Sequence, residues 1–253
     1  MNLVLLALEE LGDDGAVRIT DLRADHIARV LGSRAGDHVR VGVIDGGIGE
    51  GTVTAVRDGM VELRCRFERR APLPVPAVDL LLAVPRPKVM RRLWAQLAAL
   101  GVGRVILTNA ARVERNYFDS HVLTEAWYRP LLIEGLQQAR DTRLPAVTIR
   151  RQLRILVEDE LDGLFEHGLR VLAQPGAAGS VFRTVREQTA TRVLLAIGPE
   201  GGWTDFELDL LGDHGFQQAG IGTRTLRSDT ACIGLLALVH EALATGTAPI
   251  ARG

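Results

Sequence analysis

Two short runs of apolar residues set the strongest limit on the fold of this chain. Residues 78–84 read Val-Asp-Leu-Leu-Leu-Ala-Val, and residues 192–197 read Arg-Val-Leu-Leu-Ala-Ile. Runs of this kind, without polar alternation, are typical of parallel strands that are covered on both faces. Further strands are predicted at 104–107, 169–173 and 217–221, and helices at 90–100, 123–140, from 204 onward and 229–244. This alternation predicts an α/β domain whose parallel sheet carries helices on both faces.

The first seventy residues have a residue pattern that predicts mostly short strands. Short β-branched segments at 16–19, 38–44, 51–56 and 60–65 are separated by turn residues, and one short helix is predicted at 24–31. The stretch Ala-Pro-Leu-Pro-Val-Pro at 71–76 follows. Its alternating prolines exclude a helix and stiffen the chain. We therefore predict a small β-barrel domain at 1–72 and the α/β domain at 77–253.

The charge of the chain is unevenly distributed. The 253 residues contain 30 Lys and Arg against 31 Asp and Glu, but residues 86–154 alone hold 13 basic and 5 acidic side chains, a net charge of +8. All of these cations except Lys88 are arginines. Because the arginine fork suits phosphate oxygens, this segment indicates an anionic partner such as RNA, although a solvated arginine-rich face would have the same composition.

Several classes of protein are not supported by the sequence. Cys65 and Cys232 are the only cysteines, too few for a disulfide scaffold or a structural zinc cluster, and no two histidines stand four residues apart. The motifs of serine hydrolases, dinucleotide-binding folds and Walker-type nucleotide sites are absent. No basic leader or long apolar run is present either. We therefore expect a cytoplasmic protein that binds neither metal nor membrane.

Three loops that follow predicted strands contain the most unusual residues. They are Leu-Ala-Gln-Pro-Gly at 172–176, Ile-Gly-Pro-Glu-Gly-Gly-Trp at 197–203, and the polar stretch at 220–231. Ligands of parallel α/β sheets bind beyond the carboxyl ends of the strands, so these loops form the predicted site. The glycines of the second loop allow positive φ and close approach of the backbone to a ligand, or simply a tight turn.

Two of these loops resemble the paired signature of a known family. Gly-Pro-Glu-Gly-Gly at 198–202, followed by Leu-Arg-Ser-Asp-Thr-Ala at 226–231, is similar to the signature of the RsmE-type 16S ribosomal RNA uridine-N3 methyltransferases, which belong to the SPOUT superfamily. Residues 26–31 and Asp45-Gly46 resemble the PUA-like barrel of that family. The resemblance implies a trefoil-knotted catalytic domain, a homodimer, and a substrate in ribosomal RNA of the small subunit.

The resemblance also assigns a methyl donor and its site. The donor would be S-adenosylmethionine, and the position-by-position match implies that it is bound by Leu172, Ala173, Gln174, Gly198, Pro199, Glu200, Gly201, Gly202, Ile221, Gly222, Leu226, Ser228 and Thr230.

Three further residues are candidates for catalysis. N3 of uracil must lose a proton before it can be methylated, and negative charge then spreads over O2 and O4. Arg227 is the candidate for the RNA or uracil contact, because a guanidinium would stabilise that charge. Glu200 and Asp229 are candidate proton acceptors, and each could equally cap the helix that follows it.

The RNA-contacting residues are less well defined than the donor site. We expect phosphate contacts from His26, Arg29, Lys88, Arg91, Arg92, Arg112, Arg115, Arg140 and Arg143. The sequence departs from the family pattern at Gln96, Ala99 and Asp141. Two alternatives therefore stay open: a diverged paralogue that methylates another RNA, and a non-catalytic RNA-binding protein that retains the fold.

Overall fold

The computed structural model of the chain describes residues 3–67 and 73–246. Residues 71 and 72 of the predicted linker, and with them the predicted end of the first domain, lie outside the described residues. Two compact units are present: Met1–Val75 together with Pro130–Leu144, and Pro76–Arg129 together with Pro145–Gly253. The segment 130–144, which the proline-based division placed in the α/β domain, thus belongs with the first unit.

The second unit contains the predicted parallel sheet. Its six strands, which run in the spatial order β11-β9-β10-β6-β7-β8, are β6 (Val78–Ala83), β7 (Val102–Thr108), β8 (Ala146–Arg150), β9 (Leu169–Ala173), β10 (Val193–Ile197) and β11 (Phe216–Ala219). Every strand pair is parallel. The strand order reverses between β6 and β10, the point at which open α/β sheets bind ligands.

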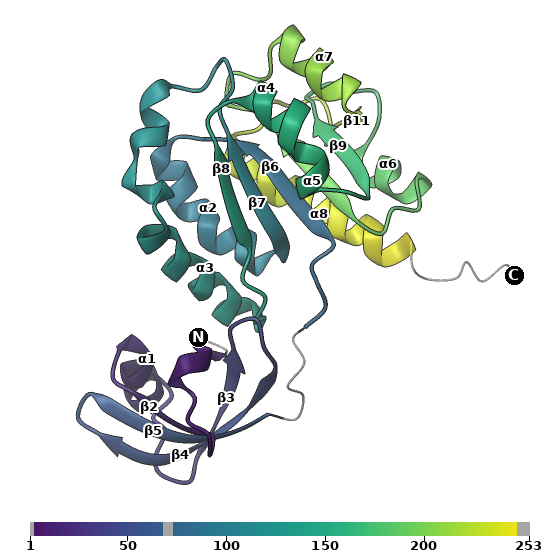
Figure 1. Ribbon diagram of the computed structural model, residues 1–253. Helices are drawn as coiled ribbons and strands as arrows, with labels where there is room; N and C mark the ends of the chain where they lie inside the picture. Colours follow the sequence, from purple (N-terminus) through teal and green to yellow (C-terminus); the bar gives the residue numbers. More distant parts are fainter. Residues whose placement is uncertain (1–2, 68–72, 247–253) are drawn as a thin grey trace, which may run out of the picture. The chain divides into compact units, whose positions relative to one another are not determined.

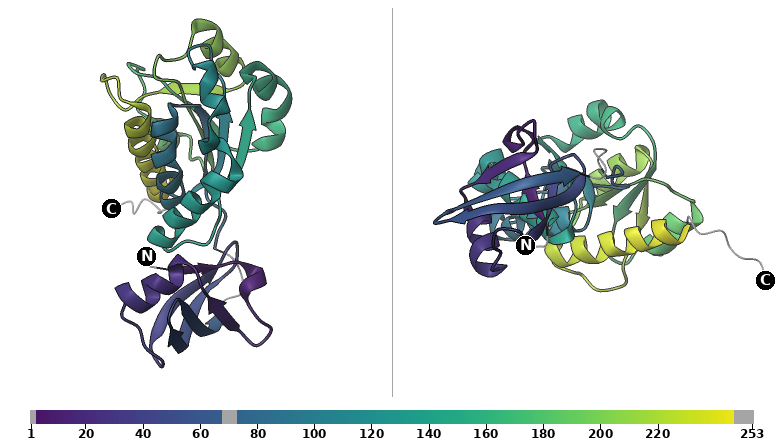
Figure 2. Two further views of the ribbon diagram at one scale, coloured as in Figure 1. Left: turned by 90° about the vertical axis from the view of Figure 1, so that its left-hand side faces the viewer. Right: turned by 90° about the horizontal axis from the view of Figure 1, so that it is seen from below.

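Helices cover both faces of this sheet, as predicted. Figures 1 and 2 show α2 (Pro87–Ala99) and α8 (Ser228–Gly246) on one face, and the short helices α4 (Leu153–Ile155) and α5 (Leu161–Leu164) on the other. The two predicted apolar runs lie in the central strands β6 and β10, which are fully buried along their length. The remaining helices of the unit are α6 (Val181–Glu187), α7 (Asp205–Asp213) and the beginning of α3 (Glu125–Ala139).

The first unit is a curled, mixed sheet. Its five strands, in the order β1-β3-β4-β5-β2, are β1 (Val4–Leu6), β2 (Ala16–Ile19), β3 (His38–Val43), β4 (Ile48–Arg57) and β5 (Met60–Phe67). The β1–β3 pair is parallel and the others are antiparallel. No pairing joins β1 to β2 within the described residues, so the predicted barrel is a half-barrel. Its concave side holds an apolar core that includes Val41, Val61 and Ile27.

The segment 130–144 contacts the β3–β4 turn of this half-barrel. The Thr142 hydroxyl donates to the Gly46 carbonyl at 2.7 Å, and the backbone N–H of Asp45 donates to the Thr142 carbonyl at 2.7 Å. Asp45 has a positive φ of 55°, and its carboxylate accepts from the Leu144 N–H at 3.0 Å. Asp141 accepts from the N–H groups of Thr142 and Arg143 at 2.6 and 2.9 Å, which fixes the turn after α3.

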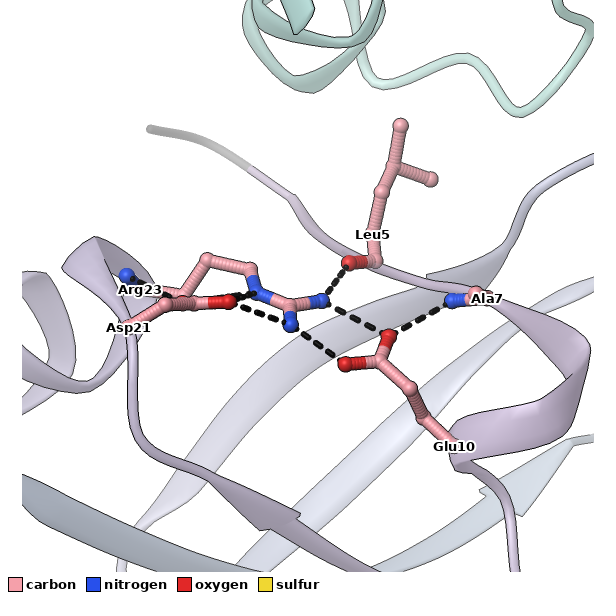
Figure 3. A network of polar contacts seen from close by, with 5 residues as sticks. All are labelled: Leu5, Ala7, Glu10, Asp21 and Arg23. Atoms are coloured by element: carbon pink, nitrogen blue, oxygen red, sulfur yellow. Dashed lines mark hydrogen bonds and ion pairs between the residues drawn. The ribbon is translucent and has the colours of Figure 1, made fainter.

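A polar cluster holds the beginning of the half-barrel together. Arg23, at the first turn of α1 (Leu22–Asp25), donates to the Leu5 carbonyl at 2.7 Å (Figure 3). It also donates to the carboxylate of Glu10 and to that of Asp21. Glu10 also accepts from the Ala7 N–H at 2.8 Å. The hydrogen bonds from Arg23 lower the pKa values of Glu10 and Asp21, and burial only partly opposes this shift.

Arg23→Ala is expected to destabilise the half-barrel by about 2–3 kcal/mol at neutral pH, because it leaves a partly buried Glu10 carboxylate without its partner. The two carboxylates have lower pKa values folded than unfolded, so their contribution is present above their unfolded pKa values and is lost as the pH falls through the folded ones. The difference from wild type should therefore shrink at pH 3. Urea unfolding at pH 7 and pH 3 measures it.

Arg18→Ala is the matched control, because Arg18 pairs with Glu62 at 3.0 Å on an exposed part of the same sheet. Arg18→Ala is expected to lower the free energy of unfolding by less than about 1 kcal/mol at either pH. An Arg23→Ala penalty that is as small as that of Arg18→Ala would show that the cluster does not stabilise the unit.

Candidate functional site

One cavity of about 300 Å³ lies at the carboxyl ends of β9, β10 and β11. Three loops form it: residues 173–175 after β9, residues 197–203 after β10, and residues 220–226 after β11. The first turns of α8 close the cavity with Ser228, Ala231 and Leu235. These are the three loops that the strand-end rule selected from the sequence.

The structure brings most of the predicted donor-site residues to this cavity. The predicted residues in its lining are Ala173, Gln174, Gly198, Pro199, Glu200, Gly201, Gly202, Ile221, Gly222, Leu226 and Ser228. The two others do not line it: Leu172 is completely buried within β9, and Thr230 is exposed on α8. Sequence reasoning missed Arg112 as a lining residue of this cavity, and also Trp203, Arg224 and Thr225.

Close packing explains the glycines of the loop after β10. A Cβ on Gly198 would lie 2.8 Å from the indole nitrogen of Trp203, and one on Gly201 would lie 3.1 Å from Cδ of Arg112. Only the third glycine, Gly202, has a positive φ, of 74°. The loop therefore needs glycine twice for space and once for conformation.

The start of α7 connects the loop after β10 to the segment that follows β7. Thr204 and Glu207 form a capping box, in which the Glu207 carboxylate accepts from the N–H and hydroxyl of Thr204 at 2.8 and 2.9 Å. The other oxygen of the buried Glu207 accepts from the Ala111 N–H at 2.7 Å. Next to it, Arg112 Nη1 donates to the Gly201 carbonyl at 2.6 Å and to the Trp203 carbonyl at 3.3 Å.

Asp229, at the start of α8, is held by two arginines. Arg92 Nη2 lies 2.7 Å from one carboxylate oxygen, and Arg227 Nε lies 3.6 Å from the other. Partial burial would raise the pKa of Asp229, but the hydrogen bonds from Arg92 and the Thr230 N–H and the two guanidinium charges outweigh it and lower the pKa. A carboxylate in this state is a weak proton acceptor at neutral pH.

Glu200 and Arg227, the other predicted catalytic residues, differ in their placement. The Glu200 side chain lines the cavity, and Arg86 Nε donates to its Oε2 at 2.9 Å. Arg227 is not among the residues that line the cavity, and its side chain is 71% exposed. Arg86, which lies three residues after the end of β6, was not singled out by the sequence.

The predicted RNA-contacting residues fall in both units. His26, Arg29, Arg140 and Arg143 belong to the first, and Lys88, Arg91, Arg92, Arg112 and Arg115 to the second. Four of them have internal partners: Arg29 lies 3.4 Å from Asp25, Arg92 pairs with Asp229, Arg112 supports the loop after β10, and Arg143 Nε donates to the Leu73 carbonyl at 2.6 Å. Arg91 and Arg115 are exposed, as RNA contacts need to be.

Within residues 3–67 and 73–246, no group of three or more His, Cys, Asp or Glu side chains is placed to hold a metal ion. The same residues contain no helix with the length and apolar character needed to cross a membrane.

Comparison with known proteins gives consistent matches along the chain. Residues 71–240 match the sequence profile of the RNA methyltransferase domain family. The "Ribosomal RNA small subunit methyltransferase E" of Treponema pallidum is 31% identical over 94% of this chain and 90% of its own length.

Two solved structures share the fold. One is a ribosomal RNA small subunit methyltransferase E from Neisseria gonorrhoeae bound to S-adenosyl methionine, with a TM-score of 0.75, 19% identity, and coverage of 95% of this chain and 97% of that one. The other, a methyltransferase from Legionella pneumophila in complex with the same cofactor, has a TM-score of 0.73, 20% identity, and coverage of 96% and 98%.

Proposed function

This chain belongs to the RsmE family of ribosomal RNA small subunit methyltransferases, and from that premise we propose that it transfers a methyl group from S-adenosylmethionine to N3 of a uridine in 16S ribosomal RNA. The observation that carries the proposal is the single cavity into which the three strand-end loops converge. Both signature stretches contribute residues to it, Gly198–Gly202 from one and Leu226 with Ser228 from the other.

The residues of the cavity fit S-adenosylmethionine. Ile197, Leu226 and Leu235 offer apolar surface for an adenine ring, and the glycine-rich backbone leaves amides and carbonyls accessible to its edge. Arg224 is available for the carboxylate of the donor, and Glu200 for its positive charges. The buried indole N–H of Trp203 has no hydrogen-bond partner among residues 3–67 and 73–246, and it offers a further donor.

The chemistry of the reaction assigns different roles to the two candidate acids. When bound, the donor supplies an electrophilic methyl group. Glu200 accepts the N3 proton of uracil, and the electron pair left on N3 forms the bond to the methyl carbon, whose former bond pair stays on sulfur. Asp229 is unsuited to this step because it does not line the donor cavity and its carboxylate is held by Arg92 and Arg227. Asp229 therefore acts as a positioning residue that fixes the start of α8.

Arg227 is assigned to the RNA, because its exposed side chain lies outside the donor cavity. Arg227→Ala should weaken RNA binding by about tenfold and lower the salt slope of binding by about one unit, as expected for one lost phosphate contact. Donor affinity should stay within about threefold, since Asp229 keeps its bond to Arg92 and an exposed ion pair contributes little to stability. Filter binding across a salt series and donor calorimetry measure both quantities.

Two results would contradict the assignment of Arg227 to RNA binding. A rate that falls by about 10²-fold at saturating RNA would place Arg227 at the uracil instead. A parallel loss of donor affinity and melting temperature would show that Arg227 only stabilises the loop before α8.

Three further features are part of the proposal. The order reversal of the sheet between β6 and β10 is compatible with a trefoil knot around the donor loops. A homodimer is supported by α8, which buries Cys232 and Leu236 within the unit and leaves Ile233 exposed. An enzyme that modifies ribosomal RNA of the small subunit works where ribosomes are assembled, which places this one in the cytoplasm.

A further inference from the structure

A second, smaller cavity adjoins the donor cavity. Its volume is about 160 Å³, and it lies at the carboxyl ends of β6, β7 and β10. It shares Arg112 and the loop residues 199–201 with the donor cavity. The loop after β10 is thus a common wall between the two cavities, and Glu200 lines both.

Arg86 forms one side of this cavity. It is the residue that precedes the first turn of α2, and its side chain is 65% exposed, so most of it remains accessible to a ligand. Its Nε donates to Glu200 Oε2 at 2.9 Å, and its side chain also hydrogen-bonds to Tyr117. A guanidinium has five N–H donors, so these two contacts leave others for a bound molecule.

Arg112 and the segment after β7 form another part of the lining. Arg112 uses Nη1 for the carbonyls of Gly201 and Trp203, which leaves its remaining N–H groups for the cavity. Tyr117, on the 3-10 turn Arg115–Asp119, interacts with both Arg86 and Glu114. Burial and the Glu114 carboxylate raise the pKa of Tyr117, so its hydroxyl stays protonated.

The lining of this cavity therefore includes the Glu200 carboxylate and the two guanidinium groups of Arg86 and Arg112, while its other carboxylate, Glu114, interacts with Tyr117. The edge of uracil is the chemical complement, because its N3–H donor stands between the acceptors O4 and O2. Resting on the proposed function, we infer that this cavity is the subsite of the target base, in which Glu200 accepts from N3–H while Arg86 and Arg112 donate to the flanking oxygens. The two arginines also stabilise the charge that develops on O2 and O4 as the proton leaves.

The same arrangement rejects cytosine. Cytosine has an unprotonated N3, which would face the Glu200 carboxylate, and an exocyclic amine, which would face a guanidinium. Both mismatches leave polar groups unpaired, the most effective way for a site to discriminate against an analogue. The position of Arg86 is set by Tyr117, which is a positioning residue in this account.

Direct binding of nucleotides tests the subsite without requiring catalysis. Saturation-transfer NMR with uridine 5′-monophosphate should give signals on the base protons H5 and H6, and cytidine 5′-monophosphate should give none. Arg86→Ala should remove the uridine signals. Arg183→Ala, a change to an exposed arginine of α6, should leave them intact. Equal signals from the two nucleotides, or uridine signals that survive Arg86→Ala, would overturn the inference.

Single-turnover methylation at saturating RNA and donor tests the same residues during the reaction. Arg86→Ala should lower the rate by about 10²-fold and leave the donor Kd within threefold, and added guanidinium ion should restore part of the rate. Tyr117→Phe, which keeps the ring, should cost about 3–10-fold, the effect of one hydrogen bond. Rates near wild type, or a loss that guanidinium does not relieve, would contradict a role at the base.

The proposed function and the proposed base subsite are contradicted by different experiments. If the wild-type protein forms no N3-methyluridine, the proposed function is wrong whatever the variants do, and nucleotide binding still decides the subsite. If the wild type is active and the Arg86 and Tyr117 variants behave like Arg183→Ala, the function stands and the subsite is wrong.

Discussion

Gly198→Ala is expected to raise the Kd of S-adenosylmethionine by about 30–150-fold. The added Cβ would lie 2.8–3.1 Å from three atoms of the Trp203 indole, which is only 4% exposed and borders free space at the donor cavity. Either Trp203 or the loop after β10 must shift into the donor cavity. Overpacking of this kind costs about 2–3 kcal/mol, and each 1.4 kcal/mol changes a binding constant tenfold.

Gly212→Ala is the matched control, because a Cβ at Gly212, on α7, would meet no atom within 4 Å. Calorimetric titration of both variants with the donor gives the comparison, and melting curves show whether either variant is unfolded. If Gly198→Ala binds the donor as well as Gly212→Ala does, the cavity between the three loops is not the donor site.

The second large effect is expected for Glu200→Gln, which should lower single-turnover methylation by about 10²–10³-fold at saturating RNA and donor. The substitution keeps the size of the side chain and removes its capacity to take the N3 proton, a contribution of this order for a general base. Stability should change by less than about 1 kcal/mol, because the Glu200–Arg86 pair is largely exposed.

Asp229→Asn provides the comparison between the two candidate acids. Its effect on the rate should stay below about tenfold, since Asp229 does not line the donor cavity and its carboxylate is held by Arg92 and Arg227. The assignment of the proton acceptor would be reversed if Asp229→Asn lost more activity than Glu200→Gln. Equal and small losses in both would mean that neither carboxylate takes the proton.

Much of the catalytic unit was predictable because its signals are local. The apolar runs in β6 and β10 mark buried strands, and the Thr204–Glu207 spacing marks the start of α7. The rule that parallel sheets bind ligands at their carboxyl ends then selected the three loops of the donor cavity. Applied in the same way to the end of β6, the rule would also have selected Arg86.

Other features depend on contacts that the sequence alone does not reveal. The edge strand β8 is partly exposed and lacks a clear apolar run, and β1 is only three residues long, so neither was predicted. Arg92 lies far from Asp229 in the sequence, yet their hydrogen bond helps to lower the pKa of that acid. The assignment of 130–144 to the first unit likewise depends on Thr142 meeting Gly46.

Identification of the methylated nucleoside tests whether this protein methylates N3 of uridine in 16S ribosomal RNA. Small-subunit ribosomal RNA from cells that lack this protein is incubated with the purified protein and methyl-labelled S-adenosylmethionine, digested to nucleosides, and resolved by chromatography with mass spectrometry. The account predicts that the label appears in N3-methyluridine from 16S ribosomal RNA, and that Glu200→Gln abolishes most of it. Label in a different nucleoside, or no transfer of label by the folded wild-type protein, would contradict it.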